Sequence, residues 1–224
     1  MNKYNTYIFD FDYTLADSSK GIVFCFKYVL AQHGYKDVSD EEIKRTIGMT
    51  LENSFKALTG ETDKEKIAIF VKEYVKKADG CMTENTVLFP ETEEVLMTLK
   101  ENGAKLGIVS TKYRYRINEV LRRDFDEGLI DVIVGGEDVT THKPSPEGLL
   151  LAIEQLNSNT NSCLYIGDST IDAEAAKAAG IDFYGVLNGA TTKEELSYYP
   201  NIMIANDLYE LLVISKNRID VTIE

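Results

Sequence analysis

Short apolar runs that end in polar residues recur along the chain, and helix-like segments lie between most of them. Such runs are typical of strands buried on both faces of a parallel sheet, covered by the helices that alternate with them. Asn102-Gly103 and Gly180 are natural helix stops just before two of the runs. The alternation predicts an α/β fold with a doubly wound parallel sheet, as in a Rossmann-like core. The predicted strands are Tyr7–Phe9, Lys105–Val109, Val132–Val134, Leu164–Ile166, Phe183–Leu187 and Ile202–Ile204, and the predicted helices are Glu91–Asn102, Tyr113–Asp124, Pro146–Leu156, Ile171–Ala179 and a closing helix Leu208–Ile214.

The interval from about residue 18 to residue 83 breaks this alternation, because it contains helical stretches and no good strand. Gly21–Gln32 is apolar at helical spacing, Ser39 to Glu42 has the form of a capping box, and Leu51–Leu58 follows. Lys64–Lys77 places its apolar residues along one stripe, as an amphipathic helix does. We therefore expect an all-helical domain, residues 17–85, inserted after the first strand of an α/β core formed by residues 1–16 and 86–224.

The charge balance restricts the partners of the chain. It has 24 basic and 37 acidic residues, a formal net charge of −13. A surface of this sign repels polyanions, which argues against a broad nucleic-acid or anionic-membrane surface. A small anionic ligand stays possible, because a local cluster of lysine and metal outweighs a distant surface field.

The cysteines and the hydropathy pattern bear on the compartment. The three cysteines, Cys25, Cys81 and Cys163, are odd in number, far apart and without metal-ligand spacing, so we interpret them as buried reduced thiols. The N-terminus does not resemble a signal peptide, and no apolar run is long enough to span a bilayer. We expect a cytoplasmic protein.

Polar clusters follow the predicted strands, at the sheet edge where open parallel sheets bind ligands. Asp10 and Asp12 leave the first strand two residues apart. One carboxylate can attack phosphorus, and the other can protonate a leaving alkoxide and later deprotonate water. Ser110 and Thr111 follow the second strand, where a hydroxyl and the amides that open a helix can hold phosphoryl oxygens. Taken alone, the aspartate pair is explained equally well as the cap of a turn, and for Ser110 and Thr111 an ordinary helix cap is the better explanation.

Two further clusters complete the pattern. Lys143 precedes a proline, which holds it extended, so it can neutralise a phosphate and a nucleophile; a solvated surface lysine is the alternative. Asp168 and Asp172 lie at the start of a helix, where negative charge is favoured. Asp10 and Asp168 could supply the few carboxylate ligands that Mg²⁺ takes, with Asp172 in a supporting role. It is improbable that four polar clusters in this order along the chain are all independent caps of turns and helices. Their order therefore favours a phosphoryl-transfer site.

The motifs FDFDYTLADS, VSTK, HKPSP and IGDSTIDAEAAKAAG resemble those of the haloacid dehalogenase-like superfamily, over Tyr7 to about Asn188. The resemblance implies that the helical insertion is a cap over the active site. This chain departs from the pattern of the family at one position, because many relatives have glycine where it has Tyr13. The implied roles are Asp10 as nucleophile, Asp12 as general acid and base, Ser110, Thr111 and Lys143 as phosphoryl-binding residues, Asp10, the carbonyl of Asp12 and Asp168 as Mg²⁺ ligands, and Asp172 as their support.

The same resemblance narrows the reaction. An aspartate at position 12 favours phosphate esters, because an alkoxide leaving group needs a proton and a halide does not. The β-phosphoglucomutase-like branch has a cationic arginine and a histidine where this chain has Leu51 and Ile22. The segment Ile47–Phe55 instead resembles the phosphoglycolate phosphatase branch, which includes pyrophosphatase-like members. The resemblance thus implies a Mg²⁺-dependent phosphatase acting on a small phosphorylated metabolite; a mutase and an inorganic pyrophosphatase are the open alternatives.

Two readings from other classes are less consistent with the residues. A phosphorylated receiver domain places its acceptor aspartate centrally in one small uncapped domain, whereas Asp10 follows the first strand here. A non-catalytic binding module on the same fold is opposed by the presence of every residue that the chemistry needs. The sequence does not indicate an oligomeric state.

Overall fold

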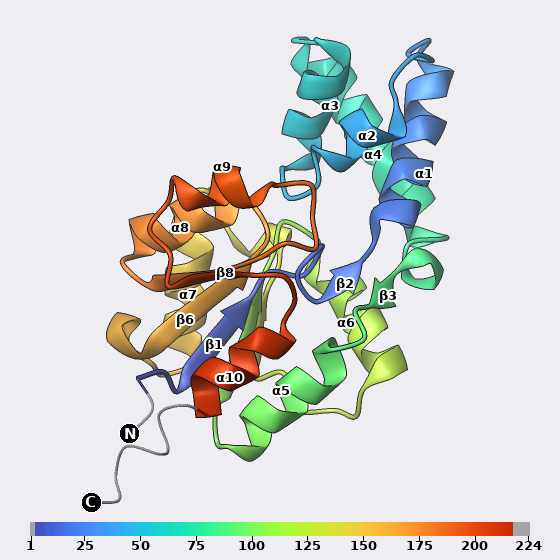
Figure 1. Cartoon of the computed structure of the whole chain (residues 1–224). Coiled ribbons are helices and arrows are strands. Elements are labelled where there is room, and N and C mark those ends of the chain that lie inside the picture. Colours follow the sequence, from blue (N-terminus) through green and yellow to red (C-terminus); the bar gives the residue numbers. More distant parts are fainter. Residues whose placement is uncertain (1–2, 217–224) are drawn as a thin grey trace, which may run out of the picture. The chain divides into compact units, whose positions relative to one another are not determined.

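The computed structural model describes residues 3–216 of the chain. Its main feature is one sheet in the order β5-β4-β1-β6-β7-β8, in which each neighbouring pair is parallel (Figure 1). The strand order reverses beside β1, as in doubly wound folds. The predicted parallel α/β fold is therefore confirmed. The strands are β1 (Thr6–Phe9), β4 (Lys105–Val109), β5 (Val132–Val134), β6 (Cys163–Gly167), β7 (Asp182–Val186) and β8 (Met203–Ala205).

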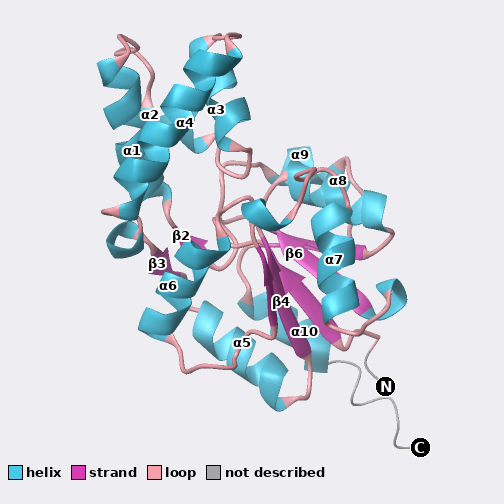
Figure 2. Ribbon diagram, turned by 180° about the vertical axis from the view of Figure 1, so that it is seen from behind, coloured by secondary structure: helices cyan, strands magenta, loops and turns pink. Residues whose placement is uncertain are grey.

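Helices cover both faces of the sheet (Figure 2). Side chains alternate between the faces of a strand, so Tyr7 and Phe9 pack with α5, α6 and α10, whereas Ile8 packs with α7 and α8. The two apolar clusters explain why the strands read as continuous apolar runs. The helices are α5 (Thr92–Glu101), α6 (Arg114–Asp124), α7 (Glu147–Gln155), α8 (Thr170–Ala179), α9 (Lys193–Ser197) and α10 (Tyr209–Lys216).

The predicted elements agree with these bounds to within two residues. Gly180, at φ 68°, ends α8 in the left-handed conformation, which confirms the predicted helix stop. The five-residue helix α9 was not predicted, and neither was the short pair β2 (Ala16–Asp17) with β3 (Val87–Leu88).

The contacts divide the chain into two compact units. One contains the six-stranded sheet, with the chain up to residue 16 and from residue 88 on, and the other is residues 17–87, here called the helical unit. The helical unit contains four α-helices. Three of them begin at a side-chain cap, including the predicted capping box of Ser39 with Glu42. The four helices are α1 (Ser19–Gln32), α2 (Asp40–Lys44), α3 (Leu51–Thr59) and α4 (Lys64–Asp79), followed by the short 3₁₀ helix η1 (Thr83–Asn85).

An aromatic cluster forms the core of the helical unit. The ring centroids of Phe26 and Phe55 lie 4.8 Å apart, and those of Phe55 and Phe70 lie 5.4 Å apart. Ile22 is buried in this core and Leu51 packs against it. Both residues therefore serve the packing of the helical unit.

The cysteines are reduced. Cys25 and Cys163 are buried and Cys81 is half-buried, and within residues 3–216 no disulfide is formed. In the same range, no helix has the length and apolar character that crossing a membrane requires.

Candidate active site

Three of the predicted site residues follow adjacent strands directly. Asp10 comes after β1, Ser110 after β4 and Asp168 after β6, and β1 lies between the other two strands. The Asp10 amide donates to the Ile166 carbonyl at 2.9 Å, which continues the sheet ladder by one residue. Because parallel strands end at one edge of the sheet, the three side chains come together there.

Lys143 is the centre of a buried ion network at this edge. Its Nζ lies 3.0 Å from Asp10 Oδ1 and 2.6 Å from Asp172 Oδ1. The side chain of Lys143 is 4% exposed, that of Asp10 is 2% exposed, and Asp172 is fully buried. The ammonium group of Lys143 thus lies beside the carboxylate for which the resemblance implies the role of nucleophile, and a solvated surface lysine is excluded.

Asp172 has both carboxylate oxygens engaged. Oδ1 accepts from Lys143 and from the Tyr165 hydroxyl at 2.8 Å, while Oδ2 accepts from the amide and hydroxyl of Ser169 at 3.1 and 2.6 Å. The Ser169 hydroxyl accepts from the Asp172 amide in return, so the two residues form a capping box at the start of α8. This arrangement suits the supporting role predicted for Asp172 better than direct metal binding.

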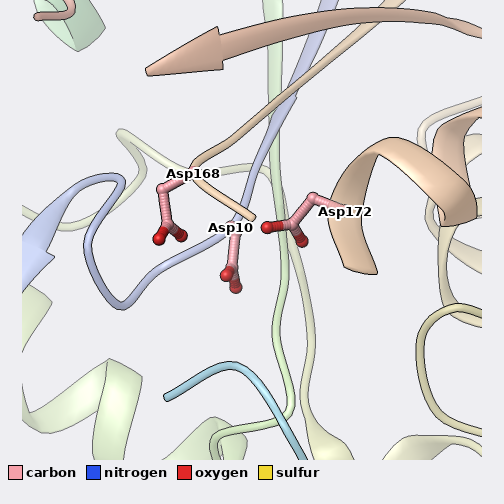
Figure 3. A group of neighbouring side chains, drawn as sticks. All are labelled: Asp10, Asp168 and Asp172. Carbon is pink, nitrogen blue, oxygen red and sulfur yellow. The ribbon is translucent and has the colours of Figure 1, made fainter. Parts of the chain in front are cut away.

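The acidic residues fit a divalent cation. Asp10, Asp168 and Asp172 each offer an oxygen, and these oxygens all lie within 4.8 Å of one another (Figure 3). Hard oxygen donors are the ligands that Mg²⁺ prefers. Gly189 leaves room beside them, since a Cβ there would lie 1.9 Å from Asp168 Oδ2. Asp10 and Asp168 are the residues that would hold the ion.

Burial governs the protonation of these carboxyl groups. Desolvation raises the pKa of Asp10 to about 6, with Lys143 opposing the shift. Desolvation, followed by the neighbouring carboxylates of Asp172 and Asp10, raises the pKa of Asp168 well above its usual range. For Lys143, burial lowers the pKa, but the charges of Asp10 and Asp172 together outweigh burial and raise it above the ordinary value. The site therefore holds more negative charge than its lysine balances.

Asp12 lies in a tight turn after Asp10 and is paired with a lysine. Its Oδ1 lies 2.9 Å from Lys112 Nζ, and the two side chains are 10% and 7% exposed. The amides of Leu15 and Ala16 donate to the Phe11 carbonyl and close the turn. Tyr13 adopts φ 58° in this turn, a left-handed conformation that glycine adopts more easily.

The predicted phosphoryl-binding pair lies in the loop between β4 and α6. Ser110 is buried, and its hydroxyl accepts from the Lys112 amide at 3.3 Å. Thr111 is half-buried. Its carbonyl lies against Gly136, since a Cβ added at residue 136 would be only 2.4 Å from the carbonyl oxygen of Thr111. The backbone of this loop is thus held against Gly136, and the loop follows β4, the neighbour of β1 in the sheet.

Sequence reasoning did not identify two residues that complete the ion network. One is Lys112, whose pairing with Asp12 follows from the packing of two loops. Tyr165 was counted among strand residues, yet its hydroxyl contacts both Lys143 and Asp172. The sequence feature that could have identified Tyr165 is its place in the strand, on the same face of β6 as Cys163 and two residues before Gly167.

Comparisons with known proteins agree with this geometry. A sequence model of the haloacid dehalogenase-like hydrolases matches residues 7–186. A pyrophosphatase PpaX from Bacillus pumilus is 32% identical, over 89% of this chain and 91% of the relative, and a phosphoglycolate phosphatase from Aquifex aeolicus is 33% identical, over 77% and 80%.

A solved structure is more similar still. It is that of a protein from Bacteroides fragilis described as a haloacid dehalogenase-like hydrolase, which is 55% identical, with a TM-score of 0.92 over 93% of this chain and all of the other. The chain therefore belongs to the haloacid dehalogenase-like hydrolase family, as one of its phosphatases.

Proposed function

We propose that the protein hydrolyses a small phosphate monoester in a Mg²⁺-dependent reaction that passes through an aspartyl-phosphate on Asp10. The observation that supports this most is the position of Lys143, whose ammonium lies between the carboxylates of Asp10 and Asp172, with all three side chains at most 4% exposed. A nucleophilic carboxylate with a fixed cation beside it is suited to attack on an anionic phosphoryl group.

The reaction would begin with attack of the Asp10 carboxylate on phosphorus. The bond from phosphorus to the leaving oxygen breaks, and Asp12 gives that oxygen its proton. Lys143 and Ser110 would bind the transferring phosphoryl oxygens while charge moves among them. Bound Mg²⁺ would supply electrostatic stabilisation of the same oxygens.

The second half would return the enzyme to its starting state. Asp12, now ionised, takes a proton from water, and the water oxygen attacks phosphorus. The bond between phosphorus and Asp10 breaks, which releases inorganic phosphate and restores the carboxylate. The ion pair with Lys112 would keep Asp12 oriented between the two steps.

A phosphoglycolate-like ester is the substrate class that we propose first, because the chain resembles a phosphoglycolate phosphatase over most of its length. Pyrophosphate is the second candidate, since several relatives carry the name pyrophosphatase PpaX. The apolar packing of Ile22 and Leu51 in the helical unit gives no support to a second cationic phosphate site at these positions, which a sugar phosphomutase requires.

We also propose that residues 17–85, within the helical unit, act as the cap of the catalytic core. The support is their place in the chain, shortly after β1, Asp10 and the turn that contains Asp12. A cap limits turnover to small substrates. Hydrolysis of phosphoproteins as fast as of small esters would contradict this role.

The test is phosphate release from a panel of small esters, pyrophosphate and β-glucose 1-phosphate, with and without Mg²⁺. Mg²⁺-dependent hydrolysis of one compound above the others would support the proposal and name the substrate class. Isomerisation of β-glucose 1-phosphate without phosphate release would favour the mutase instead.

A pair of variants assigns the nucleophile. Asp10→Asn removes the attacking charge and is expected to abolish turnover. Asp126→Asn makes the same chemical change at an exposed position and should leave turnover unchanged. Turnover retained by Asp10→Asn would exclude Asp10 as the nucleophile.

A further inference from the structure

The Tyr165 hydroxyl lies inside the Lys143 network and has no part in the reaction described above. Tyr165 belongs to β6, three residues before Asp168, and is fully buried. Its hydroxyl lies 3.0 Å from Lys143 Nζ and 2.8 Å from Asp172 Oδ1. A third contact, to the Val109 carbonyl, is longer at 3.3 Å.

The chemistry of the three groups fixes the direction of these hydrogen bonds. An ammonium group only donates, an ionised carboxylate only accepts, and a phenol has one proton. The Tyr165 hydroxyl therefore accepts from Lys143 and donates to Asp172. Lys143 also donates directly to Asp172 Oδ1, at 2.6 Å, so the three side chains form a closed ring.

The ring determines where the ammonium group can direct its remaining proton. Of the three N–H groups of Lys143, one is held by Tyr165 and one by Asp172. The third donates to the Val109 carbonyl at 3.4 Å, while Asp10 Oδ1 lies 3.0 Å from Nζ as the partner of an ion pair. Without the hydroxyl, the flexible lysine stem would be free to rotate its ammonium away from Asp10, because the bond that remains to the Val109 carbonyl is long, at 3.4 Å.

We propose that Tyr165 is a positioning residue, whose hydroxyl holds the Lys143 ammonium beside the nucleophile and the phosphoryl group transferred to it. The inference rests on the proposed function, because that function assigns Lys143 to the phosphoryl group. It adds a residue that acts through Lys143 and touches no substrate.

The packing role of the ring can be separated from the role of the hydroxyl. The Tyr165 ring packs beside Phe183, with the ring centroids 6.3 Å apart, in the apolar cluster under α7 and α8. Tyr165→Phe keeps this ring and removes only the hydroxyl. The variant is therefore expected to fold, which circular dichroism and a melting curve check.

Tyr184→Phe is a matched control on the neighbouring strand β7. Tyr184 is also fully buried, but it packs in the cluster on the opposite face of the sheet. Among residues 3–216 its hydroxyl has no hydrogen-bond partner. The control therefore makes the same chemical change in the same sheet without touching Lys143.

The measurements are kcat and KM for the best ester of the panel with Mg²⁺, together with the affinity for orthovanadate, a mimic of the phosphoryl group in transfer. A hydrogen bond to a charged group contributes enough that its loss slows kcat about 10- to 100-fold. KM should change little, because the contact matters most in the transition state. Vanadate affinity should fall with kcat, and Tyr184→Phe should leave all three quantities unchanged.

A folded Tyr165→Phe protein with wild-type kcat and vanadate affinity would overturn the inference, even if its melting temperature fell, and would leave the phosphatase function standing. Wild-type protein that releases no phosphate from any compound would overturn the proposed function itself, and the inference with it.

Discussion

Gly189 offers a direct test of the position of Asp168. A Cβ built at residue 189 would lie 1.9 Å from Asp168 Oδ2 and 2.9 Å from Asp168 Cγ. Ordinary contact with a Cβ begins at 3.4 Å, so the carboxylate would have to retreat by roughly 1.5 Å. The new methyl group would also lie 3.2 Å from the Cβ of Tyr13, which restricts how far the loop can shift instead.

A retreat of this size is large for a magnesium ligand. Mg²⁺ requires near-ideal geometry, with oxygens at about 2.0–2.1 Å. A displacement of about 1 Å at a catalytic group slows reactions on the order of 100-fold. We therefore predict that Gly189→Ala lowers kcat about 100-fold and raises the Mg²⁺ concentration for half-maximal activity by about 10-fold or more.

The assay is the Mg²⁺ dependence of phosphate release, with the Mg²⁺-induced rise in melting temperature as a measure that needs no turnover. Gly80→Ala is the control, because residue 80 has ordinary helical φ and its added Cβ would meet nothing closer than 3.8 Å. A folded Gly189→Ala protein with wild-type Mg²⁺ dependence would refute the placement of Asp168 as a fixed metal ligand.

Four further predictions concern charge and packing. Lys143→Met leaves Asp10 and Asp172 buried without their counter-charge, so it should abolish turnover and lower the free energy of unfolding by about 3–5 kcal/mol in denaturant titrations. Because burial raises the pKa of Asp10 to about 6, Mg²⁺ affinity measured by calorimetry should fall as the pH falls through about 6, and an affinity independent of pH would contradict this. The same shift makes the metal-free protein less stable as the pH rises from 3.8 to about 6, because over this range the folded state still holds a proton that the unfolded state has lost. Phe55→Ala, at a fully buried position of the helical unit, should lower the free energy of unfolding by about 3–5 kcal/mol, measured by thermal unfolding.

The sheet was predictable because its strands are buried on both faces. A strand in that environment has to be apolar throughout, so its ends are marked in the sequence by the first polar residue. Lys105–Val109 and Val132–Val134 are predicted with the same bounds that β4 and β5 have. The helix α9 was missed because five residues are too few for a helical period to be recognised, although Thr192 and Glu195 form a capping box there.

The site was predictable only in part, for a related reason. Asp10, Ser110 and Asp168 follow strand ends, and the topology alone brings strand ends together. Lys143 is different, because it lies in a loop beyond β5, and no periodicity gives the direction of its side chain. The contacts of Tyr165 with Lys143 and of Lys112 with Asp12 depend on how separate loops and strands pack, which one sequence does not determine.

The formal charges of the site connect its buried carboxylates, its two lysines and its raised carboxyl pKa values. Asp10, Asp12, Asp168 and Asp172 bring four carboxylates into a buried region, and Lys112 and Lys143 bring two ammonium groups. Two negative charges are left over, which a buried site does not tolerate. In the metal-free protein, raised carboxyl pKa values at Asp10 and Asp168 are the response, since bound protons reduce the excess. In the proposed reaction, a divalent cation would balance the same excess while leaving Asp10 ionised, so the ion that supports transfer of an anionic group would also free the proposed nucleophile from its proton.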